Sequence, residues 1–160
     1  MPQSVTFQRV KEEFSDSIVG THSELGQDTL ILAKTALLEV ARFLKQDPAL
    51  KYNYLMDLTA VDHWKRKPRF EMVYHFFSLQ HKFRLRVKAS VGGLHPEIDS
   101  LTPLWPGANW YEREVYDMFG IRFKGHPDLR RLLLYPEFKG HPLRKDYPIN
   151  RRQPLVGPQD

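Results

Sequence analysis

Two runs of alternating apolar residues, separated by a short turn, constrain the fold of this 160-residue chain more than any other feature. Alternation with a period of two is typical of strands that are buried on one face. The two apolar faces consist of Phe70, Met72, Tyr74 and Phe76, and of Phe83, Leu85, Val87 and Ala89. Because only residues 79–82 separate the runs, they predict an antiparallel hairpin, and its apolar face needs a second layer of structure to cover it.

The N-terminal part supplies further strands and a first helix. Apolar spacing predicts a helix over residues 5–14, and the short apolar runs 17–22 and 28–33 predict a second hairpin. A third strand is expected at residues 52–58. One face of this strand is expected to carry Tyr52, Tyr54, Met56 and Leu58.

The clearest helical pattern begins after Thr35, a candidate N-cap residue. Apolar residues then recur at the i, i+3, i+4 and i+7 spacing of an amphipathic helix, at Leu37, Val40, Ala41 and Leu44. The helix is expected to end at Asp47, because Pro48 disfavours helical geometry in the residue before it.

A last helix is predicted to begin at Asn109, with Glu112 completing an asparagine version of the capping box. Gly120 is the expected C′ residue. Arg113 and Asp117 stand four residues apart and are expected to pair, at a gain of only about 0.3–0.5 kcal/mol in water. The apolar stripe of this helix consists of Tyr111, Val115, Met118 and Phe119.

Together these elements predict an α+β domain over residues 1–120, with a mixed, mostly antiparallel sheet covered by helices on one face. Residues 121–160 form the second part, an extended, proline-rich C-terminal tail. The tail carries the whole net charge of +5, since it has nine Lys or Arg against four acids while residues 1–120 are neutral.

The tail is too apolar for a solubilising linker. Ordering 40 residues costs roughly 40 kcal/mol, which requires burial of about 1,600 Å² of apolar surface, the size of a standard protein–protein interface. We therefore expect the tail to become ordered on a partner, and a disordered tail is the alternative.

Composition excludes several classes of function. The chain has no cysteine, which rules out disulfides, cysteine-ligated zinc, an iron–sulfur cluster held by this chain and thiol catalysis. No apolar run is long enough for a transmembrane helix, and the N-terminus does not resemble a signal peptide, so a cytoplasmic location is expected.

No catalytic, cofactor-binding or metal site is predicted. The seven histidines include no pair at the i, i+4 spacing of a helical zinc site. Glu112 and Glu114 lie two residues apart and do not face each other on a helix. Gly92 and Gly93 do not precede a helix, as a phosphate-binding loop would.

Nucleic-acid binding is a weak alternative. The basic turn formed by residues 65–69 and the exposed strand face with Arg84, Arg86 and Lys88 supply positive charge. An RNA-binding sheet also needs exposed aromatic residues, whereas here they lie on the covered face. The basic turn is interpreted as a solvated loop or as a contact with an acidic neighbour.

One long stretch is far more specific. Residues 104–120, LWPGANWYEREVYDMFG, closely resemble the signature of the C-type subunit of proton-pumping NADH–quinone oxidoreductase, respiratory complex I. Two further blocks of the family follow in order, GHPDLRR at 125–131 and GHPLRKDYP at 140–148, and residues 54–62 and 69–79 also match in kind. The resemblance covers roughly residues 25–150.

The resemblance implies a subunit of the peripheral arm, on the cytoplasmic side of the inner membrane, that has no redox centre and meets the membrane only through the complex. NADH, FMN, iron–sulfur clusters and quinone are then bound by other subunits. The implied partners are the large subunit that helps to form the quinone site and the small iron–sulfur subunit. Separate chains of this kind are typical of bacteria.

The working hypothesis is therefore a non-catalytic scaffold. The expected signature and interface residues are Trp110, Glu112, Arg113, Glu114, Asp117, Arg130, Arg131, Arg144 and Lys145. The helix acids either hold the arginines of the tail or meet a neighbour, while Arg130, Arg131, Arg144 and Lys145 are expected to dock the tail on the large subunit. The alternatives are the equivalent subunit of a hydrogenase-like or ferredoxin-using membrane complex, and an RNA-binding module.

Overall fold

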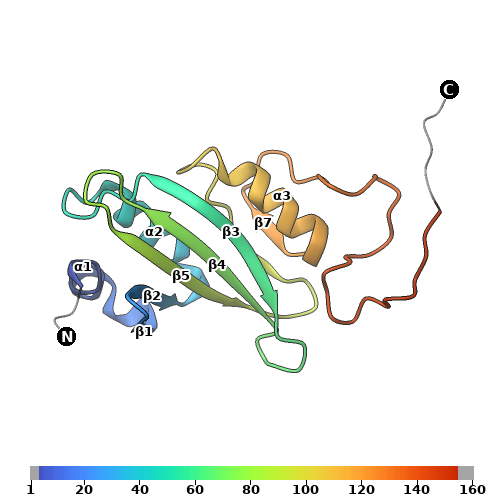
Figure 1. Ribbon diagram of the computed structural model, residues 1–160, viewed down its shortest axis with the longest axis horizontal. Helices are drawn as coiled ribbons and strands as arrows, with labels where there is room; N and C mark the ends of the chain where they lie inside the picture. Colours follow the sequence, from blue (N-terminus) through green and yellow to red (C-terminus); the bar gives the residue numbers. More distant parts are fainter. Residues whose placement is uncertain (1–3, 155–160) are drawn as a thin grey trace.

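The computed structural model describes residues 4–154, and its centre is a sheet of five strands in the order β1-β2-β5-β4-β3 (Figure 1). The strands are β1 (Ile18–Glu24), β2 (Gln27–Leu32), β3 (Tyr54–Asp62), β4 (Phe70–Phe77) and β5 (Arg84–Val91). Neighbouring strands are antiparallel except for β2 and β5, which run parallel. The α+β class and the mixed, mostly antiparallel sheet are confirmed.

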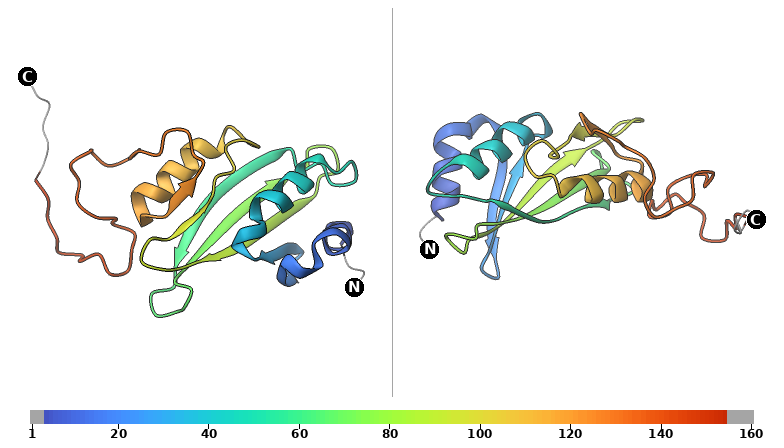
Figure 2. Two further views of the ribbon diagram at one scale, coloured as in Figure 1. Left: turned by 180° about the vertical axis from the view of Figure 1, so that it is seen from behind. Right: turned by 90° about the horizontal axis from the view of Figure 1, so that it is seen from above.

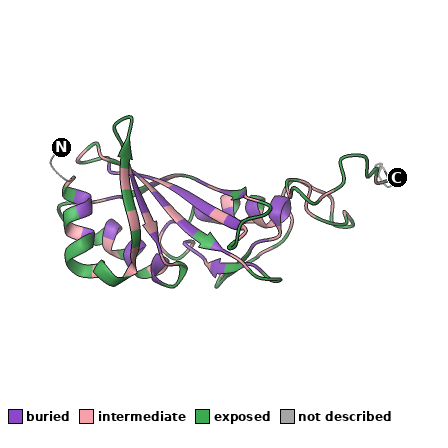
Figure 3. Ribbon diagram, turned by 90° about the horizontal axis from the view of Figure 1, so that it is seen from below, coloured by how far each residue is buried: buried purple, intermediate pink, exposed green. Residues whose placement is uncertain are grey.

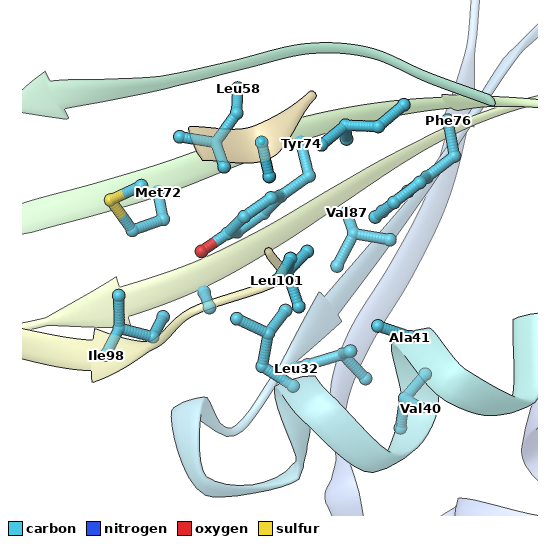
Figure 4. Packing of buried hydrophobic residues seen from close by; sticks show 14 of the residues in the cluster. Leu32, Val40, Ala41, Leu58, Met72, Tyr74, Phe76, Val87, Ile98 and Leu101 are labelled. Atoms are coloured by element: carbon cyan, nitrogen blue, oxygen red, sulfur yellow. The ribbon is translucent and has the colours of Figure 1, made fainter. Parts of the chain in front are cut away.

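The β4–β5 hairpin has the alternation that the sequence predicts. Tyr74 pairs with Val87, Phe76 pairs with Leu85, and all four side chains are almost completely buried. Figure 4 shows Tyr74, Phe76 and Val87 converging with Leu32 of β2 and with residues of helix α2, which covers this face. This continuous apolar face is the core of the molecule.

Three helices cover that face. They are α1 (Val5–Phe14), α2 (Leu37–Gln46) and α3 (Ala108–Phe119). Helix α2 lies behind the sheet in the view of Figure 1, and α3 runs beside the edge strand β3 (Figures 1 and 2). The predicted stripe of α2 is confirmed, since Leu37, Val40, Ala41 and Leu44 are buried.

Two local predictions for β3 and α2 are wrong. Tyr54 is 52% exposed and does not share a face with the buried Leu58, because an irregularity in the pairing of β3 between Leu55 and Asp57 shifts the alternation. Thr35 does not cap α2, because a 3-10 turn over Lys34–Ala36 precedes the helix and no side chain bonds to its first turn.

Helix α3 ends at Gly120, as predicted, with a left-handed φ of 74°. Behind it, the short strands β6 (Glu97–Asp99) and β7 (Arg122–Lys124) pair in parallel. Strand β7 was not expected from the sequence.

Residues 125–154, here called the C-terminal segment, contain neither helix nor strand and extend away beyond α3 (Figures 1 and 3). Residues 155–160 of the predicted tail lie outside the described part, and the division of the chain at residue 120 stays a prediction.

Candidate functional site on helix α3 and the C-terminal segment

Helix α3 carries five of the residues expected at an interface, and the fold sends them in different directions. Glu112 and Asp117 are fully buried, whereas Trp110 is 63% exposed and Glu114 is also exposed. Arg113 is partly buried, with its guanidinium 5.5 Å from the centre of the Trp110 ring. The helix therefore has an inner pair of carboxylates and an outer polar surface.

The Asp117 carboxylate is the centre of the site because it holds the C-terminal segment. One oxygen, Oδ2, accepts three consecutive backbone N–H groups, from Leu132 at 3.0 Å, Leu133 at 2.8 Å and Leu134 at 2.9 Å. The other oxygen, Oδ1, pairs with Arg131 Nη1 at 2.7 Å. Burial raises the pKa of Asp117, but these donors outweigh it and the net pKa is lowered, so the carboxylate is charged.

Two further contacts surround this carboxylate. Arg113 donates to the backbone carbonyls of Arg130 at 3.2 Å and Arg131 at 3.0 Å, so it binds the segment from the outer side of the helix. His141 Nδ1 lies 2.9 Å from the Asp117 carbonyl oxygen, and its ring packs against Gly120, where a Cβ atom would come within 2.6 Å. The close approach and the positive φ both require glycine at this position.

Glu112 serves a different loop. Its carboxyl group accepts the Ser100 hydroxyl at 2.6 Å, the Leu101 N–H at 2.7 Å and the Thr102 hydroxyl at 3.2 Å. Burial raises its pKa to about 7, although these hydrogen bonds act in the opposite direction. Glu112 therefore joins α3 to the chain that follows β6.

A second anchor of the C-terminal segment lies at the far end of β3. Asp62, whose side chain is fully buried, forms a two-point pair with Arg69, at 2.8 Å from Nε and 2.6 Å from Nη2. The same carboxylate accepts the Lys145 N–H at 2.8 Å, and Arg69 also pairs with Asp146 at 2.9 Å. The Arg69 hydrogen bonds are the main reason that the pKa of Asp62 is well below its usual range, although burial opposes them.

The structure separates the basic residues of the C-terminal segment into two groups. Arg131 faces inward to Asp117, and Arg144 pairs with Asp146 at 3.2 Å while its guanidinium lies 5.3 Å from the centre of the Phe70 ring. Arg130 is 72% exposed and has Asp128 as its ion partner within residues 4–154, and Lys145 is also exposed. Arg130 and Lys145 are thus the two predicted docking residues that face outward.

Two expectations about these residues need correction. Asp117 pairs with Arg131 rather than with Arg113, because Arg113 turns to the segment carbonyls. Glu112 does not form a capping box with Asn109, because α3 begins at Ala108 and the carboxyl group points to residues 100–102. The second guanidinium nitrogen of Arg131 also donates to the carbonyls of Phe138 and Gly140, and a docking role for Arg131 stays a prediction.

Sequence reasoning gave no role to Asp62, Arg69, Asp146 or His141. Each lies within or next to a block that resembles the family, which was the available signal. The partners lie 77 to 83 residues apart for Arg69–Asp146 and Asp62–Lys145, so no periodicity could have paired them.

The described residues offer no grouping suited to a metal ion: within residues 4–154, no three His, Asp or Glu side chains cluster. No helix in this part of the chain is long and apolar enough to cross a membrane. What the arrangement does chemically is to hold a non-helical segment against a folded body through buried, charged hydrogen bonds.

The sequence of the chain matches one known protein family. The sequence profile of the family described as "Respiratory-chain NADH dehydrogenase, 30 Kd subunit" matches residues 30–153, which include α3 and both anchors. The chain belongs to this family. The match confirms the resemblance seen in the signature of residues 104–120 and in the two blocks after it.

Two relatives are similar to this chain in sequence over nearly its whole length. The second C-type subunit of the NADH-quinone oxidoreductase of Rhizobium etli (strain CIAT 652) is 43% identical over 93% of this chain and 79% of its own length. The C-type subunit of the same enzyme from Citrifermentans bemidjiense is 46% identical over 93% of this chain and 92% of its own length.

Solved structures show the same fold. A trypsin-resistant fragment of Nqo5 is 33% identical, with a TM-score of 0.68, over 78% of this chain and 100% of the fragment. A chain from the archaeal membrane-bound sulfane sulfur reductase has a TM-score of 0.74 over 90% of this chain and 84% of its own, and at 23% identity it shows the fold alone.

Proposed function

We propose that this family member is the C-type subunit of a proton-pumping NADH–quinone oxidoreductase and acts there as a structural and assembly subunit without catalytic residues. Its relatives of this type and its family support the assignment. The observation that carries the structural role is the pair of buried carboxylates, Asp117 and Asp62, that fix the C-terminal segment to the body.

The anchored segment presents a surface suited to a neighbour. Leu133 is 63% exposed, Leu143 is 53% exposed and Ile149 is completely exposed, and the exposed Arg130 lies shortly before Leu133 in sequence. Because the segment is already held at two points, less ordering is needed when it binds, and preorganisation of this kind favours affinity. The segment is therefore a partly preformed docking element.

The partners in this proposal are the large subunit of the quinone site and the small iron–sulfur subunit, on the cytoplasmic side of the inner membrane. Arg130 and Lys145 contact the large subunit, while NADH, FMN, the iron–sulfur clusters and quinone are bound by other subunits. The sheet gives the RNA-binding alternative little support, because Phe70, Tyr74 and Phe76 are buried and Tyr54 is the only exposed aromatic residue on a strand within residues 4–154.

The test is isolation of the native complex from membranes that carry a tagged copy of this chain, which should contain the other quinone oxidoreductase subunits. In an Arg113→Ala variant, loss of the bonds to the Arg130 and Arg131 carbonyls should lower the amount of assembled complex and its NADH–quinone reductase activity together. Arg42→Ala, which removes an exposed arginine of α2 outside the predicted interface, is the control. Normal assembly of the Arg113→Ala variant with lost turnover would instead indicate a direct role in the chemistry.

A further inference from the structure

The loop between β3 and β4 carries a concentration of positive charge to which the proposed function assigns no role. Residues 64–68 are all exposed, and they include the consecutive cations Lys65, Arg66 and Lys67. Within residues 4–154, no carboxylate lies at ion-pair distance from any of these three. Their charges are therefore not compensated by the body of the protein.

The fold adds cations from the C-terminal segment to this loop. The bond from the Lys145 N–H to Asp62 and the Arg69–Asp146 pair bring residues 144–146 to the end of the sheet where the loop lies (Figure 1). The charged side chains of loop and segment are six cations and two carboxylates, Asp62 and Asp146, which leaves an excess of four positive charges. Asp62 neutralises Arg69 and Asp146 neutralises Arg144, so the excess consists of Lys65, Arg66, Lys67 and Lys145.

An exposed apolar side chain, that of Trp64, lies among these cations. Trp64 is 44% exposed, and its backbone has a φ of 51°, a left-handed conformation that bulky residues rarely adopt. Asp62 Oδ1 holds this conformation by accepting the Trp64 N–H at 2.8 Å, and the Arg69 guanidinium lies 5.0 Å from the ring centre. The indole is thus fixed at the surface by the same residues that anchor the segment.

The neighbouring loop after β5 extends the apolar area. A Cβ atom on Gly92 would lie 3.1 Å from Pro68, so the two loops are in contact, and Leu94 in the second loop is 93% exposed. Tryptophan and arginine are among the residue types enriched at the centres of protein interfaces, and the surrounding rim is polar and accessible to solvent. This composition distinguishes the surface from an ordinary solvated turn.

We propose that residues 64–68, with Leu94, form a second docking surface next to Lys145, here called the basic end, which binds an acidic patch on another protein subunit. The identity of the complex rests on the proposed function. A protein partner is favoured over single-stranded nucleic acid, because one exposed indole gives no succession of stacking surfaces. It is favoured over an anionic membrane because the basic end lies on loops and has no amphipathic helix to insert.

The test reverses the charge of the loop in the full chain within its complex. Lys65, Arg66 and Lys67 are changed to Glu together, and the control changes Lys11, Arg42 and Lys82 to Glu. The control residues are also exposed and lie on α1, α2 and the β4–β5 turn, at the other end of the sheet, and they alter the net charge equally (Figures 1 and 3). The measurement is the amount of chain that stays with the complex during isolation at low and at high salt.

The proposal expects at least tenfold less of the loop variant in the complex than of the control, and a wild-type association that weakens with salt because rim charges are screened. Equal retention of the two variants overturns the proposal. If wild-type chain fails to co-purify with quinone oxidoreductase subunits, the proposed function itself is wrong. If both variants stay in the complex but only the loop variant loses binding to vesicles rich in phosphatidylglycerol, or to labelled RNA, a protein partner is also the wrong occupant.

Carbodiimide cross-linking identifies the acidic partner directly, because it joins a lysine amine to a carboxylate in contact with it. In the isolated complex, Lys65 or Lys67 should be linked to an Asp or Glu of one other subunit, and Lys11 and Lys82 should not. Trp64→Ala provides an uncharged check, since it should reduce retention without changing the salt dependence. Cross-links from Lys65 and Lys67 confined to this chain would contradict the inference.

Discussion

Replacement of Asp117 by Asn tests the anchoring of the C-terminal segment with almost no change of shape. The substitution removes the negative charge that faces Arg131 Nη1 at 2.7 Å. The amide that replaces the carboxylate has only one oxygen that can accept hydrogen bonds. The three N–H groups of Leu132, Leu133 and Leu134 then compete with Arg131 for one oxygen. We expect the segment to detach locally while the sheet stays folded.

The expected magnitude follows from the burial of the pair. Breaking a buried ion pair by removing one partner costs about 3–5 kcal/mol. The Asp117 side chain is completely buried and that of Arg131 is 18% exposed, so the lower end, about 3 kcal/mol, applies. Since each ~1.4 kcal/mol changes an equilibrium constant tenfold, local opening of the segment should become about 100-fold more frequent.

Amide hydrogen exchange measures this opening at the residues concerned. The protection of the Leu132, Leu133 and Leu134 amides should fall by about 100-fold in the variant, whereas amides of β4 and β5 should keep their protection. Glu114→Gln removes the same charge from the exposed side of α3 and should change nothing. Less than a threefold loss of protection in the Asp117 variant, or an equal loss in the control, would refute the anchoring by Asp117.

Three further predictions concern stability. Gly120→Ala places a Cβ in a left-handed backbone, 2.6 Å from the His141 ring, and should lower the Tm by about 3–6 °C in a thermal melt; an unchanged Tm contradicts this steric argument. Burial raises the pKa of Glu112 from 4.5 to about 7, so the folded state binds more protons between these values. The free energy of unfolding should therefore fall by about 3 kcal/mol as the pH rises from 4.5 to 7, and urea titrations should show no such fall in Glu112→Gln. Arg69→Met leaves the Asp62 carboxylate buried without a cation and should cost about 3 kcal/mol, and the double variant with Asp62→Asn should lose less than the sum of the single changes; additive losses in the double-mutant cycle would argue against the pair.

The regular elements with a strict period could be predicted from the sequence. Strands β4 and β5 alternate without interruption, so Tyr74, Phe76 and Val87 were placed correctly in the core, and the i, i+3, i+4 stripe of α2 was equally clear. Gly120 marked the end of α3 because only glycine takes a left-handed φ without strain. Each of these signals depends on residues within a few positions of one another.

Prediction failed where one residue disturbs the period. The irregular pairing in β3 between Leu55 and Asp57 moves the alternation by one position, which exposes Tyr54 although Tyr52 and Leu58 of the same pattern are buried. Such an irregularity follows from how β3 fits against β4 and α3, and the residues of β3 alone do not reveal it.

The charged residues of the site show most clearly which features the sequence predicts and which depend on the folded structure. The sequence alone showed that α3 has acids at Glu112 and Asp117 and that the segment after it is basic. It also showed which family the residue pattern resembles. The folded chain was needed to show that Asp117 pairs with Arg131, and that Asp62 receives Lys145 from 83 residues away. A buried carboxylate is stabilised by whichever donors the fold brings to it, and those donors come from chain distances at which no local pattern carries information.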